Sequence, residues 1–305
     1  MVNSKSFLEF INTECSFATE MRTIFFKLLK KISFQLGAAV AIFFGMLGIV
    51  FSAEAKSSVQ NPESMLQVGE ELEYSVHYSL FNIGTIRLKI LDRTVHNGKV
   101  AYRAAAYIDS NPSLSWLVNL HVHFFTLMDK DVFSYEWSGE DSSNKEISYQ
   151  RMIFDYHSQK MYFEKGKKTK NGSLHPYERD TVLISQKSQD GLSLFYFARA
   201  NVHQQADTTV PTCIENSERK TDFHFFNESK KVKIDEVDYP IDCVHFRGVA
   251  DFTGIFGLSG GFEGWFSNDC AAVPITARLK VILGSVRVEL RKWNRENWEP
   301  PRWSK

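Results

Sequence analysis

The segment ELEYSVHYSL, residues 71–80, alternates between apolar and polar side chains with a period of two. Leu72, Tyr74, Val76 and Tyr78 fall on one side of this pattern, and the polar residues between them fall on the other. Successive side chains of a β-strand point to opposite faces of a sheet. The segment therefore predicts a strand with one buried face.

The alternation continues in the next two segments. GTIRLKILD, residues 84–92, and VAYRAAAYI, residues 100–108, both read as strands. Between them lies Asn97-Gly98, which is a strong hairpin signal because both turn positions require a positive φ. The three segments together predict an antiparallel meander.

Strand-like segments make up most of the remaining chain, and two interruptions predict short helices. NPSLSWLVNL, residues 111–120, opens with an asparagine suited to an N-cap and a proline suited to the first helical position. QDGLSLFYFARAN, residues 189–201, is expected to start at a cap formed by Asp190 or Ser188. We expect Asp190 to act as a cap rather than as a catalytic acid.

Roughly a dozen strands with only two short helices exclude an alternating βαβ plan. A sheet of this many antiparallel strands must curl or close to protect its edges. We therefore expect an all-β, mainly antiparallel fold, in which a curved sheet closes into a barrel or half-barrel with the two short helices at its mouth or inside. A two-sheet β-sandwich is the alternative.

The N-terminal region has the features of a secretory signal. Four basic residues between positions 22 and 31 precede an uncharged apolar run over 32–51, and Ala53-Glu54-Ala55 follows as a small-residue cleavage site. We expect residues 1–55 to be a signal peptide, with cleavage between Ala55 and Lys56 and with Met21 as an alternative start. The alternative is an uncleaved helix that anchors the protein in the inner membrane.

The rest of the chain is expected to form one β domain, residues 56–293, followed by an extended tail. The tail, residues 294–305, has adjacent prolines and no periodicity. The chain has 36 basic and 36 acidic side chains, and no basic stripe is visible. This balance argues against binding to nucleic acid.

Three cysteines follow the predicted cleavage site: Cys213, Cys243 and Cys270. An odd count in an exported protein allows at most one internal disulfide. If CVHFRGVADF and GFEGWFSNDC form one hairpin centred on Phe256 and Gly257, Cys243 lies opposite Cys270. We therefore predict a Cys243–Cys270 disulfide. Two buried free thiols, or a register shifted by a bulge, are the alternatives.

The stretch FGLSGGFEG, residues 256–264, contains the spacing G-x-S-x-G of a nucleophile elbow. An elbow needs a helix directly after the serine, but the residues after Ser259 alternate as a strand does. No histidine follows His245, so the usual order of a Ser-Asp-His triad is impossible. We expect a hairpin turn here and no catalytic residues.

The same stretch holds the candidate contact residues. Ile255, Phe256 and Leu258 lie in a loop that is too rich in glycine to bury them all, so we expect them to contact a ligand or a membrane; a loop packed on its own sheet is the alternative. His121 and His123 share a strand face, but a zinc site needs three or four ligands. We expect no metal and no cofactor.

Three longer segments resemble a known family. They are VGEELEYSVHYSLFNIGTIRLKI, QDGLSLFYFAR and GWFSNDCAAVPITARLKVILGSVRVEL. Their order and spacing resemble the exported bacterial family called domain of unknown function 3108. The resembling features are Val68-Gly69-Glu70, Gly84 between the first two strands, the helix from Asp190 to Arg199, W-x-S-x-D at Trp265 to Asp269, Pro274, and I-L-G-S-V at 282–286. The chain has D-G-L-S at Asp190 where the family often has D-P-L-S.

The resemblance implies a periplasmic or envelope β protein with no assigned activity, and it brings no catalytic residues. We therefore expect a non-enzymatic protein, exported to the bacterial periplasm, that binds a hydrophobic or envelope-derived ligand such as a lipid. Its contact with the membrane is expected to be transient or through the signal peptide only. A structural or protein-interaction module of the envelope is the alternative, and a hydrolase is the least favoured reading.

Overall fold

The computed structural model describes residues 62–114, 116, 119–253, 258–281 and 284–304. The chain divides into two compact units, residues 1–56 and 57–305, and all described residues belong to the second. The predicted signal peptide, with Met21, Ala55 and Lys56, lies outside the described residues. Among the residues that are described, no helix is both long and apolar enough to cross a membrane.

The second unit consists almost entirely of β-strands. Its helical segments are α2 (Pro62–Met65), α3 (Ser193–Asn201) and a 3-10 turn (Pro112–Leu114). The strands are β1 (Glu71–Tyr78), β2 (Phe81–His96), β3 (Lys99–Ser110), β4 (His121–Asp129), β5 (Ser134–Asp141), β6 (Ile147–Asp155), β7 (Lys160–Lys168), β8 (Leu174–Leu183), β9 (Ala206–Ile214), β10 (Ser217–Val232), β11 (Ile241–Thr253), β12 (Leu258–Ser267), β13 (Pro274–Val281) and β14 (Ser285–Asn294).

All the strands form one antiparallel sheet, in the order β8-β7-β6-β5-β4-β3-β2-β1-β14-β13-β12-β11-β10-β9. The first strand therefore pairs with both β2 and the last strand, β14. The predicted all-β antiparallel class is confirmed. The sheet is continuous, so the alternative of two packed sheets is wrong, and it is not closed, because β8 and β9 remain its two edges.

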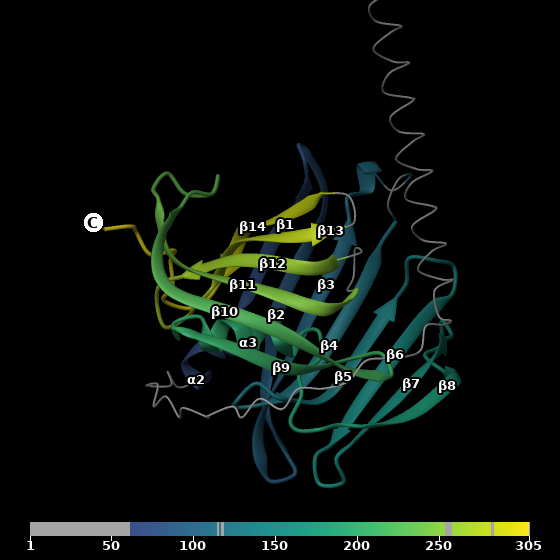
Figure 1. The fold of residues 1–305 in the computed structure, drawn as a ribbon. Coiled ribbons are helices and arrows are strands. Elements are labelled where there is room, and N and C mark those ends of the chain that lie inside the picture. The colour runs from purple at the N-terminus through teal and green to yellow at the C-terminus, as the bar shows by residue number, and fades with distance from the viewer. Residues whose placement is uncertain (1–61, 115, 117–118, 254–257, 282–283, 305) are drawn as a thin grey trace, which may run out of the picture. The chain divides into compact units, whose positions relative to one another are not determined.

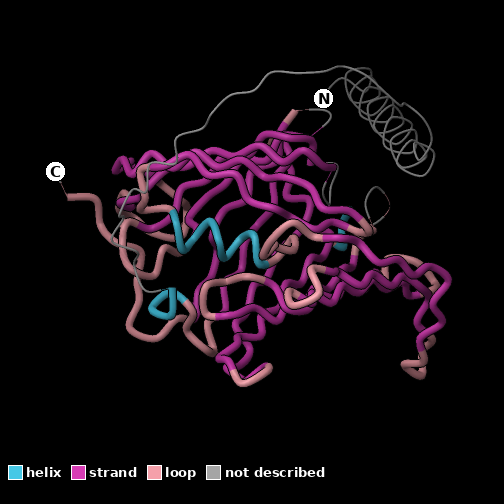
Figure 2. Tube along the Cα trace, turned by 60° about the horizontal axis from the view of Figure 1, so that its bottom comes forward, coloured by secondary structure: helices cyan, strands magenta, loops and turns pink. Residues whose placement is uncertain are grey.

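The curved sheet wraps around helix α3, which connects its two edges (Figures 1 and 2). One apolar core joins the helix to the inner face of the sheet. Its helical members include Tyr196, Phe197 and Ala198, which meet buried residues from strands on both sides of β1. The predicted second helix is thus confirmed, whereas the first is reduced to the 3-10 turn over Pro112–Leu114.

The two edges are bridged by side chains and by a short piece of the connecting segment. Gln189 pairs with β9 through its backbone, donating to Pro211 O at 2.9 Å and accepting from Cys213 N at 2.7 Å. The Ser185 amide donates to the Glu218 carboxylate at 3.1 Å. These contacts stabilise the gap between the two edges, although β8 and β9 do not pair with each other.

The first hairpins follow the sequence pattern closely. Leu72, Tyr74 and Val76 are all buried, as the alternation predicts. Asn97 and Gly98 both have positive φ, 49° and 75°, and connect β2 to β3 as the predicted turn.

Gly84 does not lie between the first two strands, as the resemblance suggests. It lies inside β2, opposite Val76 and Ser110. A Cβ atom at this position would be 2.5 Å from the carbonyl oxygen of Asp109. The glycine is therefore required by the close approach of β3, whereas the turn itself is formed by Ser79, with a φ of 54°, and Leu80.

The register of β11 and β12 corrects the cysteine prediction. Cys243 lies opposite Ser267, because Thr253 pairs with Ser259, one residue away from the predicted register, and the pairing shifts again between Val249 and Thr253. Cys270 is in the loop after β12. Cys243 and Cys213 are buried free thiols and Cys270 is an exposed one, so the structure does not form the predicted disulfide. Burial raises the pKa of the Cys213 thiol to about 12 and also raises the pKa of Cys243.

The C-terminal segment runs beside the start of β11. The amide of Asp242 donates to Pro301 O, and the amide of Trp303 donates to Pro240 O, each at 2.8 Å. The indole of Trp298 donates to Asp269 Oδ2 at 2.8 Å. Extended backbone therefore covers this end of the sheet.

The close contact at Gly84 gives a first prediction. Gly84→Ala should lower the free energy of unfolding by about 1–3 kcal/mol, because the added methyl group would force β2 and β3 apart. Urea unfolding followed by circular dichroism measures the change. Gly261→Ala in β12 is the matched control, since a Cβ there would meet no atom within 4 Å. Equal losses in both variants would contradict the steric explanation.

Candidate functional site

The interior of the sheet holds a buried ion pair between Glu70 and Arg199. Glu70 is 3% exposed and directly precedes β1, while Arg199 is 1% exposed and lies in the last turn of α3. Arg199 donates from Nη1 to Glu70 Oε1 at 2.6 Å and from Nη2 to Glu70 Oε2 at 3.0 Å. This two-pronged geometry is the strongest that a guanidinium forms with a carboxylate.

The remaining donors of Arg199 bind backbone oxygens. Nη2 donates to Ala271 O at 2.9 Å, and Nε donates to Ala272 O at 3.2 Å. Burial opposes the positive charge of Arg199, but the neighbouring Glu70 carboxylate outweighs burial and raises the pKa of Arg199. The arginine therefore stays charged in the core.

A second arginine completes the group, which we call the anchor cluster: Glu70, Arg199 and Arg295. Arg295 follows β14 and donates to Glu70 Oε2, to Met65 O at 3.0 Å and to Ser64 O at 3.0 Å. The cluster thus joins the segment before β1, the end of α3 and the segment after β14.

The loop between β12 and β13 is shaped to present carbonyl oxygens to this cluster. Asp269 Oδ1 accepts hydrogen bonds from Ser267 Oγ at 2.8 Å and from the amides of Ala271 and Ala272 at 3.0 and 3.1 Å. The bonds turn the backbone so that both alanine carbonyls point at Arg199. Asp269 therefore positions the anchor without contacting it.

Asp190 holds the other end of α3. Its Oδ1 accepts from the amides of Leu192 and Ser193 at 2.6 and 2.8 Å, which is the predicted capping role. Its Oδ2 accepts from Ser134 Oγ at 2.6 Å and from Thr126 Oγ1 at 2.5 Å, and so ties the helix to β4 and β5. Burial raises the pKa of Asp190, although these hydrogen bonds oppose the shift.

Two tyrosine hydroxyls, of Tyr74 and Tyr196, are buried near the anchor cluster and have no hydrogen-bond partner among the described residues. Burial raises the pKa of both phenols. They therefore remain protonated at neutral pH.

Most of the predicted contact loop lies outside the residues that the structure describes. Ile255 and Phe256 lie outside the described residues, and Leu258 is described only as backbone, paired with Val281. An open depression of about 460 Å³ adjoins this loop and includes Phe252 and Gly260 in its lining. Ser259 lies in β12, opposite Thr253, so the strand-turn-helix of a nucleophile elbow is not formed.

The two histidines of β4 have separate neighbours. His121 Nδ1 lies 2.9 Å from Asp109 Oδ1, and the His123 ring packs edge-on against Tyr107 with centroids 5.0 Å apart. Within the described part of the chain, no group of three or more His, Cys, Asp or Glu residues is placed to hold a metal ion.

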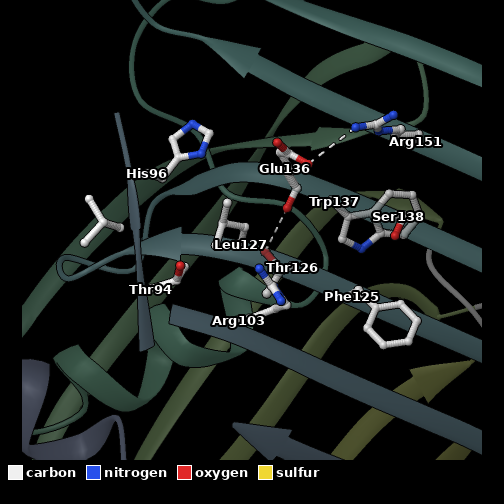
Figure 3. A pocket seen from close by; sticks show the side chains of 11 residues that line it. Thr94, His96, Arg103, Phe125, Thr126, Leu127, Glu136, Trp137, Ser138 and Arg151 are labelled. Carbon is white, nitrogen blue, oxygen red and sulfur yellow. Dashed lines mark hydrogen bonds and ion pairs between the residues drawn. The ribbon is translucent and has the colours of Figure 1, made fainter. Parts of the chain in front are cut away.

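A second open depression, which we call the outer depression, has a volume of about 290 Å³ (Figure 3). Arg103 lies between Tyr102 and Ala104, which are buried in the core, so it points to the opposite, outer face of the sheet. The lining residues come from the end of β2, next to the β2–β3 turn, and from β3, β4, β5 and β6. They are Thr94, Val95, His96, Arg103, Phe125, Thr126, Leu127, Glu136, Trp137, Ser138 and Arg151.

The outer depression combines arginines with apolar side chains. Arg103 Nη1 donates to Asp92 Oδ2 at 3.2 Å, and Arg151 lies 3.5 Å from Glu136 Oε2, the ion pair drawn in Figure 3. Phe125 lies between them in the register and packs edge-on against Tyr107 at 6.2 Å. The side chains of Arg103 and Arg151 are about half exposed, at 50% and 47%, so they retain free donors for a bound partner.

Comparison with known proteins places the chain in a family. The family described as "Protein of unknown function (DUF3108)" matches residues 73–291, which is more than half of the chain. The chain belongs to the DUF3108 family. The resemblance read from the sequence is thereby confirmed. No curated protein matches this DUF3108 chain.

The DUF3108 chain is also similar to solved structures at low identity. One is a β-barrel-like protein of domain of unknown function DUF1849 from Brucella abortus, at 8% identity, with 76% of this chain and 99% of that chain covered and a TM-score of 0.47. Another, a putative exported protein from Bacteroides fragilis, has a YmcC-like fold. Its identity is 7%, with 75% of this chain and 97% of that chain covered and a TM-score of 0.34. A hypothetical protein from Chlamydia trachomatis is 12% identical, with 82% of this chain and 98% of that chain covered and a TM-score of 0.33.

Three of the sequence features that resemble the DUF3108 family meet at α3. Glu70 and Arg199 form the ion pair, Asp269 shapes the loop that binds Arg199, and Asp190 caps the helix. The ion pair between Glu70 and Arg199 was not predicted from the sequence. One signal was present: Leu192, Tyr196 and Arg199 share a helical face, and an arginine on an apolar face requires a buried carboxylate.

The anchor cluster gives a second prediction. Glu70→Ala should lower the free energy of unfolding by about 3–5 kcal/mol, because it leaves two buried guanidinium groups without their carboxylate. The neighbouring Glu71→Ala is the matched control. It removes only a surface pair with Lys89 at 2.8 Å and should cost less than about 1 kcal/mol. Similar midpoints of thermal unfolding for the two variants would contradict the structural role of Glu70.

Proposed function

We propose that this DUF3108 protein is a non-enzymatic, exported protein of the bacterial envelope that acts as an interaction module. It binds a protein partner on the outer depression. The position of α3 is the observation that carries this proposal. The helix and its apolar side chains occupy the inner face of the sheet, where a carrier would hold its ligand.

A lipid carrier would need an apolar cavity of about 300–1,000 Å³ that encloses most of its ligand. The outer depression and the one beside Phe252 are open, and charged side chains line both: Arg103, Glu136 and Arg151 in the first, Glu215, Arg219 and Asp251 in the second. This argues for the interaction module over the hydrophobic-ligand carrier. The curved, open sheet then serves as a half-barrel scaffold that holds the outer face rigid.

The composition of the outer depression favours a protein partner. Arginine and aromatic residues contribute most to binding energy at protein interfaces, and they do so best when they are held in place. Phe125 is fixed by Tyr107, and Arg103 and Arg151 are oriented by Asp92 and Glu136. A partner with an apolar side chain flanked by carboxylates would fit this arrangement.

Export places this surface in the periplasm. The basic, apolar and small-residue regions before Lys56 support a cleaved signal peptide. An uncleaved helix in the inner membrane would present the same depression to the same compartment. Ser259 belongs to a strand, which supports a role without hydrolysis.

Site-specific photo-crosslinking in the periplasm of the source bacterium tests the proposal. A photoreactive amino acid in place of Ser138, which lines the depression, should form one discrete protein adduct. Arg103→Glu combined with Arg151→Glu should reduce its yield by roughly tenfold or more, because truncation of an interface anchor typically costs about 2 kcal/mol or more. Arg179→Glu, on the exposed edge strand β8, should leave the yield unchanged.

Native mass spectrometry of protein purified from the periplasm separates the two binding functions. The interaction module is expected to give the mass of the polypeptide alone after detergent-free purification. A stoichiometric lipid adduct would contradict the proposal and support the carrier.

A further inference from the structure

One end of the sheet carries exposed apolar side chains in neighbouring turns. Leu80, in the two-residue turn between β1 and β2, is 93% exposed, and Phe81 beside it is 58% exposed. Trp116, in the connection between β3 and β4, is 57% exposed. These residues lie apart from the outer depression.

Hydrogen bonds hold the two turns side by side. The amide of Asn111 donates to Ile83 O, and its side-chain Nδ2 donates to Asn82 O, both at 2.9 Å. The start of β14 also lies at this end, because Tyr78 pairs with Val286. The top of Figure 1 shows the β1–β2 and β3–β4 turns together.

The turns at the opposite end of the same strands are polar, although Val95 and Leu183, 69% and 74% exposed, lie beside two of them. Its turns carry Asn97-Gly98 between β2 and β3, Lys130-Asp131 between β4 and β5, and His157-Ser158 between β6 and β7. Antiparallel strands place alternate turns at opposite ends of a sheet. Leu80, Phe81 and Trp116 are thus grouped in neighbouring turns at one end of the sheet.

A row of cationic side chains leads to the apolar turns across the outer face. The register places Arg247, Glu263, Arg278, Arg287 and His77 opposite one another on β11, β12, β13, β14 and β1. The three arginine side chains are 65%, 63% and 52% exposed, whereas Glu263 is 25% exposed. His77 is two residues from the β1–β2 turn.

The cations in this region outnumber the carboxylates. Glu263 lies 3.7 Å from Arg247 and 3.5 Å from Arg278, so one carboxylate serves two arginines. Arg287 lies 3.1 Å from Glu289, so the three arginines of the row share two carboxylates. The row therefore retains positive charge that faces solvent.

We propose that this end of the sheet docks on an anionic phospholipid surface. Leu80, Phe81 and Trp116 enter the headgroup region, and the arginine row contacts lipid phosphates. Exposed leucine, phenylalanine and tryptophan next to lysine and arginine are the combination that binds bilayer interfaces. The cationic row explains why the lipid surface is anionic.

Vesicle co-sedimentation tests this docking surface. The protein used is the chain from Ser57 onward, because this unit is compact and has its own core, and because it lacks the apolar run over 32–51. We expect binding to vesicles of equal parts phosphatidylethanolamine and phosphatidylglycerol, and weaker binding to vesicles of phosphatidylcholine alone. High salt should reduce the difference between the two.

Leu80→Ser combined with Phe81→Ser and Trp116→Ser should lower the partition coefficient by roughly tenfold or more. Arg278→Ser with Arg287→Ser should lower binding to the anionic vesicles but not to the neutral ones. Leu183→Ser is the matched control, because Leu183 is 74% exposed at the far end of β8 and should not affect binding.

Leu80→Ser alone keeps the test valid if the triple variant does not fold, since a side chain 93% exposed contributes little to the core. No binding by the parent chain, or equal binding by the parent and the turn variants, would overturn the proposal. An equal loss in the Leu183 control would also overturn it. Photo-crosslinking at Ser138 reports on the outer depression separately, so the two proposals fail independently.

Discussion

Removing a guanidinium and a carboxylate from water is costly, and the cost is offset only when both groups find complete sets of partners. The anchor cluster meets this condition with atoms from four separate parts of the chain. Glu70 precedes β1, Arg199 ends α3, the carbonyls of Ala271 and Ala272 lie between β12 and β13, and Arg295 follows β14. The position of α3 within the sheet depends on this convergence, because a helix displaced by one turn would leave Arg199 buried and unpaired.

Much of the fold could be predicted from local patterns. Alternation over 71–80 and the Asn97-Gly98 turn identified the first strands, and the segment from Asp190 onward identified α3, because these signals depend on neighbouring residues only. The register of β11 and β12 could not be predicted. The pairing of Thr253 with Ser259 already differs by one residue from the predicted register, and a further shift between Val249 and Thr253 places Cys243 opposite Ser267. Gly84 was misplaced for a similar reason, since its neighbour is Asp109 of another strand.

The candidate sites were harder to predict than the fold. Arg103, Phe125 and Arg151 come from three strands, and only the sheet order brings them together. The pairing of Glu70 with Arg199 spans 129 residues of sequence. Conversely, the alternation after Ser259 correctly predicted a strand rather than a helix, because this signal depends on neighbouring residues only. Local sequence thus constrains backbone conformation well, whereas side-chain groupings depend on topology.

The pairing of β1 with β14 has a consequence for how the chain acquires its structure. Ser75 Oγ donates to Glu289 O across a separation of 214 residues. Contacts between such distant residues form slowly, because a long loop must close before the strands can pair. When the chain emerges from its N-terminus, β1 becomes available for pairing first and β14 last. One side of β1 therefore stays an unpaired edge until the whole chain has emerged, and during that interval it is open to pairing with other strands.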